Sequence, residues 1–186
     1  MKNLLILKKK TYEYKVRVIG SKISLDRFYS NIDSGLIIED LLKLSDPNFN
    51  EKTIFVWPEG ILPGISQEKL IKYKSLFDEK LNQNHILIFG MNNEKFSKDS
   101  KLFFNSLFVY DNDLNIVDHY NKIKLVPFGE FLPFESFLKK IGLRSLTNNY
   151  QSFTKGNQRK VIEIKKQNFS LKILPLICYE IIYSGE

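Results

Sequence analysis

Short apolar runs of strand length recur along the chain, and each is followed by a polar or proline-containing segment. The runs are KTIFVW at 52–57, HILIFGM at 85–91, FFNSLFVYD at 103–111 and FSLKILPLIC at 169–178. Runs of this length that are rich in β-branched and aromatic residues are typical of buried strands. Because amphipathic segments and polar turns separate them, the pattern restricts the chain to a layered fold built around a sheet.

Two segments between these runs have the spacing of amphipathic helices. Residues 34–44 predict one helix, and residues 67–83 predict another that begins after Ser66, a favourable N-cap residue. The apolar positions that share a helical face are Ile37, Leu41, Leu44, Leu70, Tyr73, Phe77 and Leu81. The sequence therefore predicts a mixed α/β (α+β) domain.

Further strands are expected on either side of these helices. Residues 12–20, YEYKVRVIG, alternate apolar and polar side chains, which is the period of a half-buried strand. NIVDHY at 115–120 follows a polar turn at Asn112–Asp113, and KVIEIK at 160–165 precedes the run that holds the cysteine. We expect the run 103–111 and the strand 115–120 to form a hairpin-like pair around this turn, and the last two strands to lie on either side of Lys166–Asn168.

Charge and composition exclude some function classes. The chain has 186 residues and a net charge of +7, with lysines spread along its whole length. This distribution favours a solvated lysine-rich surface over nucleic-acid binding, for which no motif is present; attraction to an anionic lipid surface is a further interpretation. No run approaches the roughly 18 apolar residues of a membrane helix, so no transmembrane segment is expected in this chain.

Sulfur and histidine are scarce. One cysteine forms no internal disulfide, and two histidines with one cysteine make a structural zinc site improbable. The single cysteine, Cys178, is instead a candidate for thiol chemistry.

Three segments carry residues that chemistry of this kind requires. Glu59 follows a strand in FVWPEGILPG, Lys122, Lys124 and Glu130 lie in HYNKIKLVPFGEFLPF, and Cys178 lies in LICYEI. Each has an ordinary interpretation by itself: a turn glutamate, surface lysines, an inert buried thiol. Together they supply a nucleophile, a base for its proton and a cation for an oxyanion.

These motifs resemble a known family. Trp57-Pro58-Glu59, Tyr120-Asn121-Lys122 with the following LVPFGE, and Cys178-Tyr179-Glu180 are similar to the Glu–Lys–Cys signature of the nitrilase (carbon–nitrogen hydrolase) superfamily. YNKIKLVPFGEFLP and ICYEI resemble, more narrowly, the bacterial apolipoprotein N-acyltransferases. The resemblance implies a four-layer α-β-β-α sandwich.

The resemblance also implies the role of each residue. Glu59 would be the general base, Lys122 the oxyanion-stabilising cation and Cys178 the nucleophile. Spacing alone leaves Lys124 as an alternative to Lys122, because both would share a strand face; the match to the family's Asn-Lys pair selects Lys122. The residues that would support these three are Glu130, which would orient Lys122 and the incoming amine, Glu180, and the backbone N–H of Tyr179.

The implied reaction is a ping-pong acyl transfer, for which we expect neither a metal nor an organic cofactor. A phospholipid acyl chain would form a thioester on Cys178 and then pass to the N-terminal amine of a diacylglyceryl-cysteine lipoprotein, at the periplasmic side of a bacterial inner membrane. A soluble amidase that uses the same three residues is the alternative. A third hypothesis is a non-catalytic module that binds acidic lipid or nucleic acid through its lysines.

A short aromatic stretch near Glu130 has two interpretations. Phe128, Phe131 and Phe134 are either part of an apolar arm that meets acyl chains or part of the core. The resemblance also implies membrane helices before the domain and more of the domain after Cys178. We therefore expect residues 1–186 to be a partial carbon–nitrogen hydrolase domain, incomplete at its C-terminal side, that is poorly soluble and has little activity alone.

Overall fold

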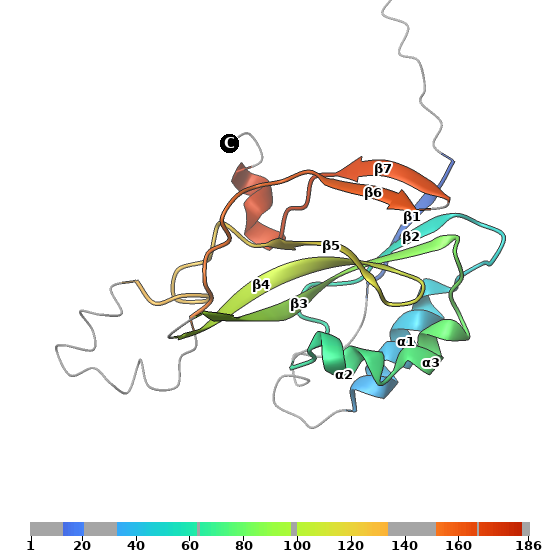
Figure 1. Ribbon diagram of the computed structural model, residues 1–186, viewed down its shortest axis with the longest axis horizontal. Coiled ribbons are helices and arrows are strands. Elements are labelled where there is room, and N and C mark those ends of the chain that lie inside the picture. The colour runs from blue at the N-terminus through green and yellow to red at the C-terminus, as the bar shows by residue number, and fades with distance from the viewer. Residues whose placement is uncertain are drawn as a thin grey trace, which may run out of the picture.

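The computed structural model describes residues 13–20, 33–62, 64–97, 100–133, 152–166 and 168–183. Its main element is a five-stranded mixed sheet with the strand order β1-β2-β3-β4-β5 (Figure 1). The parallel strands are β1 (Lys15–Val18), β2 (Thr53–Val56) and β3 (His85–Ser97). The antiparallel additions are β4 (Ser100–Asp111) and β5 (Ile116–Asn121). A separate antiparallel pair consists of β6 (Ile162–Lys166) and β7 (Phe169–Ile173).

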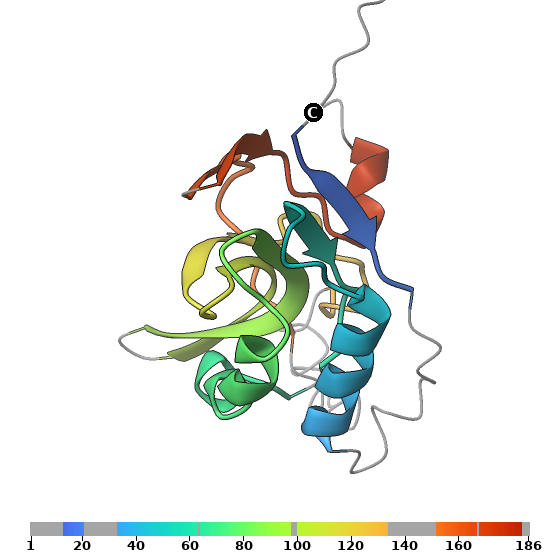
Figure 2. The same ribbon diagram turned by 90° about the vertical axis from the view of Figure 1, so that its right-hand side faces the viewer.

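The described residues form three layers. Helices α1 (Ser34–Ser45), α2 (Gln67–Ile71) and α3 (Lys74–Asp78) cover one face of the five-stranded sheet, and the β6–β7 pair lies over the other (Figures 1 and 2). A short 3-10 helix, η2 (Cys178–Tyr183), follows β7. The predicted mixed α/β architecture is confirmed. The expected outer helical layer beyond β6–β7 is not found in the part of the chain that the structure describes.

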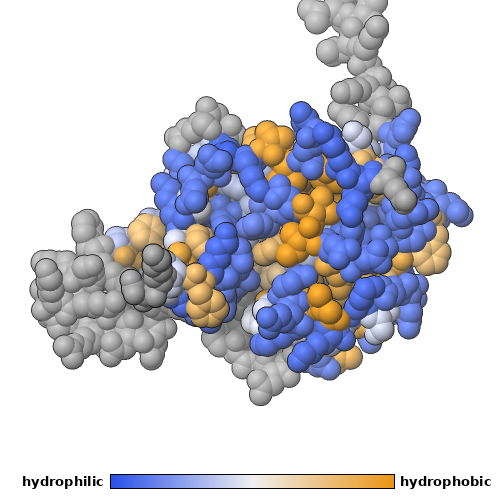
Figure 3. All heavy atoms as spheres, in the orientation of Figure 1, coloured by the Kyte–Doolittle hydropathy of each residue, from blue (hydrophilic) through white to orange (hydrophobic). Residues whose placement is uncertain are grey.

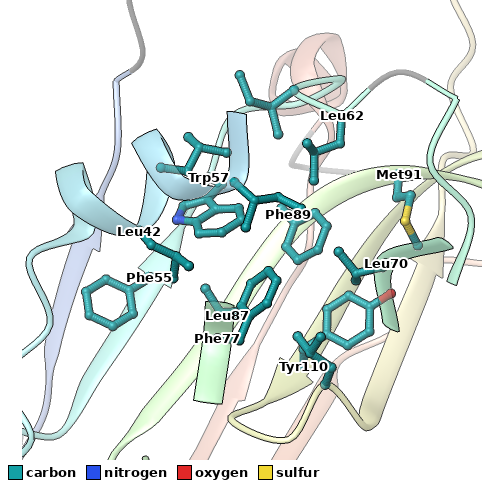
Figure 4. Packing of buried hydrophobic residues seen from close by; sticks show 14 of the residues in the cluster. Leu42, Phe55, Trp57, Leu62, Leu70, Phe77, Leu87, Phe89, Met91 and Tyr110 are labelled. Atoms are coloured by element: carbon teal, nitrogen blue, oxygen red, sulfur yellow. The ribbon is translucent and has the colours of Figure 1, made fainter. Parts of the chain in front are cut away.

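Two apolar clusters hold the layers together. Between the helices and the sheet, the ring of Trp57 lies 6.0 Å from that of Phe77 and 5.4 Å from that of Phe89, measured between centroids (Figure 4). The second cluster lies between the sheet and β6–β7 and contains Ile54, Ile86, Ile88, Val109, Ile162, Ile164 and Phe169. Because the central strands are buried on both faces, their sequences are continuously apolar rather than alternating.

Helix α1 has well-defined ends. The side chain of Asp33 accepts a hydrogen bond of 2.9 Å from Gly35 N, which caps the first turn. Asp46 adopts a left-handed conformation with φ 42° and ends the helix, and Pro47 follows it. Ile38 and Leu41 are completely buried between these ends. The predicted helix at 34–44 is confirmed.

The segment at 67–83 differs from its prediction as one helix. The side chain of Ser66 accepts a hydrogen bond from Lys69 N, as expected of the N-cap, but α2 ends at Ile71 and α3 begins at Lys74. At the break, Lys72 N donates to Lys69 O at 3.2 Å and Tyr73 N to Leu70 O at 3.0 Å. These bonds span three residues instead of four, so the chain is wound more tightly there than in an α-helix.

The first strand is shorter than predicted, and its apolar face is not covered. Arg17 points toward α1 and donates hydrogen bonds of 2.5 and 2.7 Å to the backbone oxygens of Ser45 and Asp46. Because side chains alternate across a strand, Val16 and Val18 face the opposite side. Both are exposed to solvent, as far as the described residues show, so the expectation of a half-buried strand is wrong for them.

The face of the molecule seen in Figure 3 is mostly hydrophilic where it is coloured. Figure 3 shows apolar side chains as patches that interrupt a largely polar face. Within the described ranges, no helix has both the length and the apolar composition needed to cross a bilayer.

Candidate active site

Glu59 is positioned by the end of β2. Trp57 N donates to Ile88 O at 2.9 Å, which extends the ladder one residue beyond the strand, and Trp57 Nε1 donates to the hydroxyl of Ser45 at 2.9 Å. The chain then turns through Pro58, Glu59 and Gly60, which has a φ of 61°. Glu59 therefore stands at the carboxyl end of a rigid parallel strand, with its side chain 37% exposed.

A glycine in the neighbouring strand allows the Glu59 turn to lie close to the sheet. A Cβ added to Gly90 would meet the Cα of Glu59 at 3.2 Å and the nitrogen of Gly60 at 3.4 Å. Both contacts are with backbone atoms, which cannot rotate away. Because Gly90 has no side chain, the turn of Glu59 can approach β3 this closely.

Lys122 lies immediately after β5. Its backbone N–H donates to Asn105 O at 2.8 Å, so the residue stays tied to β4 although the strand ends at Asn121. Its side chain is only 2% exposed. The Nζ atom lies 2.9 Å from Oε1 of Glu130 and 3.7 Å from Oε1 of Glu59. A buried ammonium group is thus held between two carboxylates.

Lys124 has a different environment. Because β5 does not continue beyond Asn121, Lys122 and Lys124 do not share a strand face. The Nζ of Lys124 lies over the ring of Tyr183, 4.9 Å from its centroid. The two lysines that spacing left equivalent are therefore distinguished by the structure, and Lys122 is the one beside Glu59.

Glu130 is directed back toward Lys122 by a tight turn. Pro127 and Phe131 form an isolated bridge, Phe128 has a left-handed φ of 62°, and Glu130 N donates to Val126 O at 2.8 Å. The second carboxylate oxygen of Glu130 accepts a hydrogen bond of 2.9 Å from Val126 N. The LVPFGE segment is thus the turn that presents one carboxylate oxygen to Lys122.

Cys178 lies outside any strand, which corrects the prediction that the run 169–178 is a single strand. β7 ends at Ile173, Pro175 lies between that strand and the cysteine, and Cys178 opens η2 with a φ of 50°. Proline removes a ladder donor, so the sheet cannot continue through it. Cys178 is exposed rather than buried in an apolar strand.

Glu180 connects this cysteine turn to the Lys122 segment. Its carboxylate is completely buried. One oxygen accepts from Tyr120 Oη at 2.9 Å, Ile123 N at 2.7 Å and Lys124 N at 3.0 Å, and the other accepts from Ile177 N at 2.9 Å. Four donors therefore compensate the buried charge.

Tyr120 donates the side-chain hydrogen bond of this set. Burial, followed by the hydrogen bond to Glu180, raises the pKa of Tyr120 above its ordinary value. The phenol therefore stays protonated and remains a donor at neutral pH.

The structure brings together three of the predicted residues, Glu59, Lys122 and Glu130. Cys178 is tied to the same end of the sheet through Glu180, but among the described residues no hydrogen bond joins its thiol to Glu59 or Lys122. Tyr179 follows the thiol and is exposed. Phe128 is largely exposed and Phe131 is partly buried, both on the LVPFGE turn, whereas Phe134 lies outside the described residues.

A mainly apolar hollow of about 670 Å³ lies beside this arrangement. The LVPFGE turn forms one side of it, and η2 forms another. Its lining includes Leu125, Val126, Phe131, Phe153, Tyr179 and Tyr183. An apolar ligand group placed there would be next to the residue that follows Cys178 in the chain.

Asn105 is a site residue that the sequence interpretation missed. Its Nδ2 donates to Oε1 of Glu59 at 2.7 Å and to Oε1 of Glu130 at 2.6 Å. The available signal was a polar side chain inside the apolar run FFNSLF. That signal does not reveal which residues the amide would contact, because both glutamates are distant in sequence.

Comparison with known proteins identifies the family. The family model described as carbon–nitrogen hydrolase matches residues 50–185, which is more than half of the chain. The chain belongs to the carbon–nitrogen hydrolase family. The resemblance predicted from the three motifs is confirmed.

Relatives that are similar to this chain include apolipoprotein N-acyltransferases of several bacteria. The apolipoprotein N-acyltransferase of Brucella suis is 31% identical over 177 residues, covering 92% of this chain and 32% of the relative. That of Rhizobium leguminosarum is 33% identical, covering 84% of this chain and 30% of the relative. The chain therefore spans about a third of the length of these relatives.

Two solved structures resemble part of the structure of this chain. The glutamine-dependent NAD+ synthetase of Acinetobacter baumannii has a TM-score of 0.47 at 22% identity, covering 83% of this chain and 26% of that chain. Nit3 of Saccharomyces cerevisiae, a member of the nitrilase superfamily, has a TM-score of 0.44 at 16% identity, covering 86% and 52%.

Possible metal ligands within the described ranges are His, Cys, Asp and Glu side chains. No group of three or more His, Cys, Asp or Glu side chains is placed there to hold an ion.

Proposed function

We propose that this chain carries the catalytic residues of an N-acyltransferase that moves a phospholipid acyl chain through a cysteine thioester to a lipoprotein's N-terminal amine. The observation that carries the proposal is the buried Lys122 between Glu59 and Glu130, with the Cys178 turn tied to the Lys122 segment by Glu180. The motif match and the names of the curated relatives support the same reaction.

In the first half-reaction, the thiol of Cys178 attacks the ester carbonyl carbon and Glu59 accepts the thiol proton. The ammonium group of Lys122 and the N–H of Tyr179 stabilise the oxyanion that forms. When the tetrahedral intermediate collapses, the glycerol oxygen leaves and takes the proton from Glu59. The products are a thioester on Cys178 and a lysophospholipid.

In the second half-reaction, the free amine of the diacylglyceryl-cysteine attacks the thioester. Glu59 accepts a proton from the attacking nitrogen and returns it to the departing sulfur of Cys178. The products are an amide and the free thiol, so protons and bonds balance over the cycle. No metal or organic cofactor takes part in these steps.

Lys122 forms two ion pairs, one of 2.9 Å with Glu130 and one of 3.7 Å with Glu59. Because the pair with Glu130 is shorter, Glu130 is the residue that holds the ammonium group in place. The apolar hollow beside Tyr179 and the exposed Phe128 are suited to acyl chains. We place the reaction at a bacterial inner membrane because both substrates are lipids. Its periplasmic side and a complete four-layer α-β-β-α domain follow from the resemblance to the N-acyltransferases.

Amide hydrolysis is the second candidate. Membership of the carbon–nitrogen hydrolase family favours it, and the same base, cation and nucleophile serve both reactions. The two differ in the acceptor of the acyl group, which is water in hydrolysis and an amine in transfer.

Mass spectrometry of the Cys178 peptide distinguishes these candidates. The protein, purified as its whole gene encodes it, is incubated with phosphatidylethanolamine vesicles without an acceptor. We expect a fatty-acyl thioester on Cys178 that a diacylglyceryl-cysteine peptide discharges as an N-acyl product, and no adduct in Cys178→Ala. Absence of the thioester, together with hydrolysis of small amides, would replace the proposal with the amidase.

A further inference from the structure

The side chain of Asn105 lies between the carboxylates of Glu59 and Glu130, which have different roles in the proposed reaction. We propose that Asn105 is a positioning residue: its amide holds Glu59 in place as the base while leaving the ammonium of Lys122 committed to Glu130. The inference rests on the proposed function, because it assigns Asn105 to the same site.

The orientation of the amide is fixed by its partners. The –NH₂ group has two hydrogens, and the two short contacts of Nδ2, 2.7 Å to Glu59 and 2.6 Å to Glu130, account for both. The opposite orientation would place the amide oxygen against two carboxylate oxygens. Asn105 is thus a neutral double donor that sets the distance between two anions.

The two carboxylates have unequal access to the cation. Nζ of Lys122 makes a hydrogen bond of 2.9 Å to Glu130, whereas its 3.7 Å separation from Glu59 is longer than a hydrogen bond. Hydrogen bonds to an ionised carboxylate are stronger than those between neutral groups, and this applies both to the bond from Lys122 to Glu130 and to the bond from Asn105 to Glu59. Held by the amide instead, Glu59 keeps a defined position while remaining able to accept a proton.

Asn105 also controls the position of Lys122 itself. Its backbone oxygen accepts the N–H of Lys122 at 2.8 Å. Asn105 lies within β4, where it is paired with Asn92 of β3, and the other edge of β4 pairs with the antiparallel strand β5. A single residue on a doubly paired strand therefore contacts the base, its partner glutamate and the backbone of the lysine.

This geometry predicts a pH effect. The charged groups that face Glu59 among the described residues are Lys122 directly and Glu130 across Asn105; the neighbouring strand presents Gly90, which carries no charge. A hydrogen bond donated to a carboxylate favours its ionised form, so removing it makes protonation easier. The acidic limb of any base-dependent reaction of Cys178 should then move to higher pH.

The test uses the whole protein and two reactions of Cys178, measured from pH 5 to pH 9. The first is thioester formation from phosphatidylethanolamine vesicles, and the second is alkylation by iodoacetamide, which needs no lipid chemistry. For Asn105→Ala we expect both rates at pH 7 to fall about tenfold and the half-maximal pH to rise by about one unit. Asn105→Asp should raise it further, because it adds a third carboxylate.

A matched control is available in Asn93 of β3, whose side chain donates to the amide oxygen of Asn121 at 3.4 Å rather than to a carboxylate. Asn93→Ala should leave both pH profiles unchanged. Thermal unfolding of each variant separates positioning from stability.

Two results would overturn the inference. One is an unchanged half-maximal pH in Asn105→Ala and Asn105→Asp, with rates that fall only in step with thermal stability. The other is a pH profile of alkylation that does not change in Glu59→Gln. That result would show that Glu59 does not act as the base, so Asn105 would have no base to position. A third result separates the two proposals. If the wild type forms no thioester, but the pH profile of alkylation in the Asn105 variants is shifted from that of the wild type as expected, the acyl-transfer proposal fails and the positioning role of Asn105 stands.

Discussion

The carboxylate of Glu180 accepts a hydrogen bond of 2.7 Å from the backbone N–H of Ile123. Glu180 lies two residues after the cysteine, and Ile123 follows Lys122 directly. One buried side chain therefore joins the turn that carries the thiol to the end of β5, where the lysine leaves the sheet. Because neither segment is in a strand at that point, this contact provides a register that the sheet does not.

Replacement of Glu180 should loosen that connection. Both carboxylate oxygens of Glu180 accept hydrogen bonds from backbone N–H groups. In Glu180→Gln, an –NH₂ group replaces one of these oxygens, so at least one buried N–H loses its acceptor. We expect a loss of about 1–3 kcal/mol in the free energy of unfolding, measured by urea denaturation, together with slower thioester formation on Cys178. Glu163→Gln, at an exposed position on β6, is the control and should change stability by less than about 0.5 kcal/mol. Equal stability of the two variants would contradict a connecting role for Glu180.

Removal of the Lys122 charge should destabilise the site through its partner. Lys122→Met leaves the largely buried Glu130 without its cation, and breaking a buried ion pair by removing one partner costs about 3–5 kcal/mol. The double variant Lys122→Met/Glu130→Gln also removes the unpaired charge of Glu130, and it should recover much of the lost free energy of unfolding. Activity should remain absent in both. Denaturation and thioester assays on the same preparations test this prediction, which fails if the double variant is less stable than the single one.

Gly90→Ala should impair catalysis more than stability. Its new Cβ would lie 3.2 Å from the Cα of Glu59, so the base must move by a few tenths of an ångström. Small displacements of reacting groups have large effects on rate, and we expect about a tenfold slower thioester formation. Gly20→Ala, where an added Cβ meets nothing within 4 Å, is the control. An unchanged rate in Gly90→Ala would show that the turn of Glu59 tolerates the shift.

The two histidines should make the protein less stable in mild acid. Burial lowers the pKa of His85 and also that of His119 below the ordinary value of 6.5. His85 Nδ1 accepts a hydrogen bond of 3.0 Å from Asn82 N, so this nitrogen must be unprotonated in the folded chain. The unfolded chain binds protons at higher pH than the folded one, and the free energy of unfolding should fall as pH decreases below 6.5.

The His85 contribution can be measured with His85→Gln, which should flatten the dependence of the unfolding free energy on pH between about 7 and 5. His119→Gln is the comparison, because that ring is half-buried and lies on β5 rather than on β3. If neither variant changes the slope, groups other than the histidines control stability in that range.

Phe128 distinguishes the two interpretations of the aromatic stretch. Its side chain is 72% exposed, which favours a contact with lipid over a place in the core. Burial of a phenylalanine contributes about 1.5–3 kcal/mol, so Phe128→Ser should weaken binding to phospholipid vesicles about tenfold or more, with little change in thermal unfolding. Phe49→Ser, an exposed phenylalanine before the start of β2, should bind normally. A lower unfolding temperature with unchanged vesicle binding would favour the core interpretation.

Local sequence patterns predicted the elements whose stability is local. The helix at 34–44 has its capping residue and its apolar face within one segment, and the strands at 53–56 and 85–91 are continuous apolar runs. The three motifs also identified Glu59, Lys122 and Cys178 as candidates, because Cys178 is the single cysteine of the chain and the resemblance to a known family selected one glutamate and one lysine among many.

The arrangement of those candidates depends on contacts between segments that are distant in sequence, and no local pattern encodes it. Lys122 differs from Lys124 only because β5 ends at Asn121, and Cys178 leaves the strand run because Pro175 precedes it. Asn105, Gly90 and Glu180 acquire their importance from neighbours that are 31 to 57 residues away in sequence, since a hydrogen bond or a close backbone approach depends on distance in space. The sequence determined which chemistry was available, and the tertiary structure decided which side chains hold it in place.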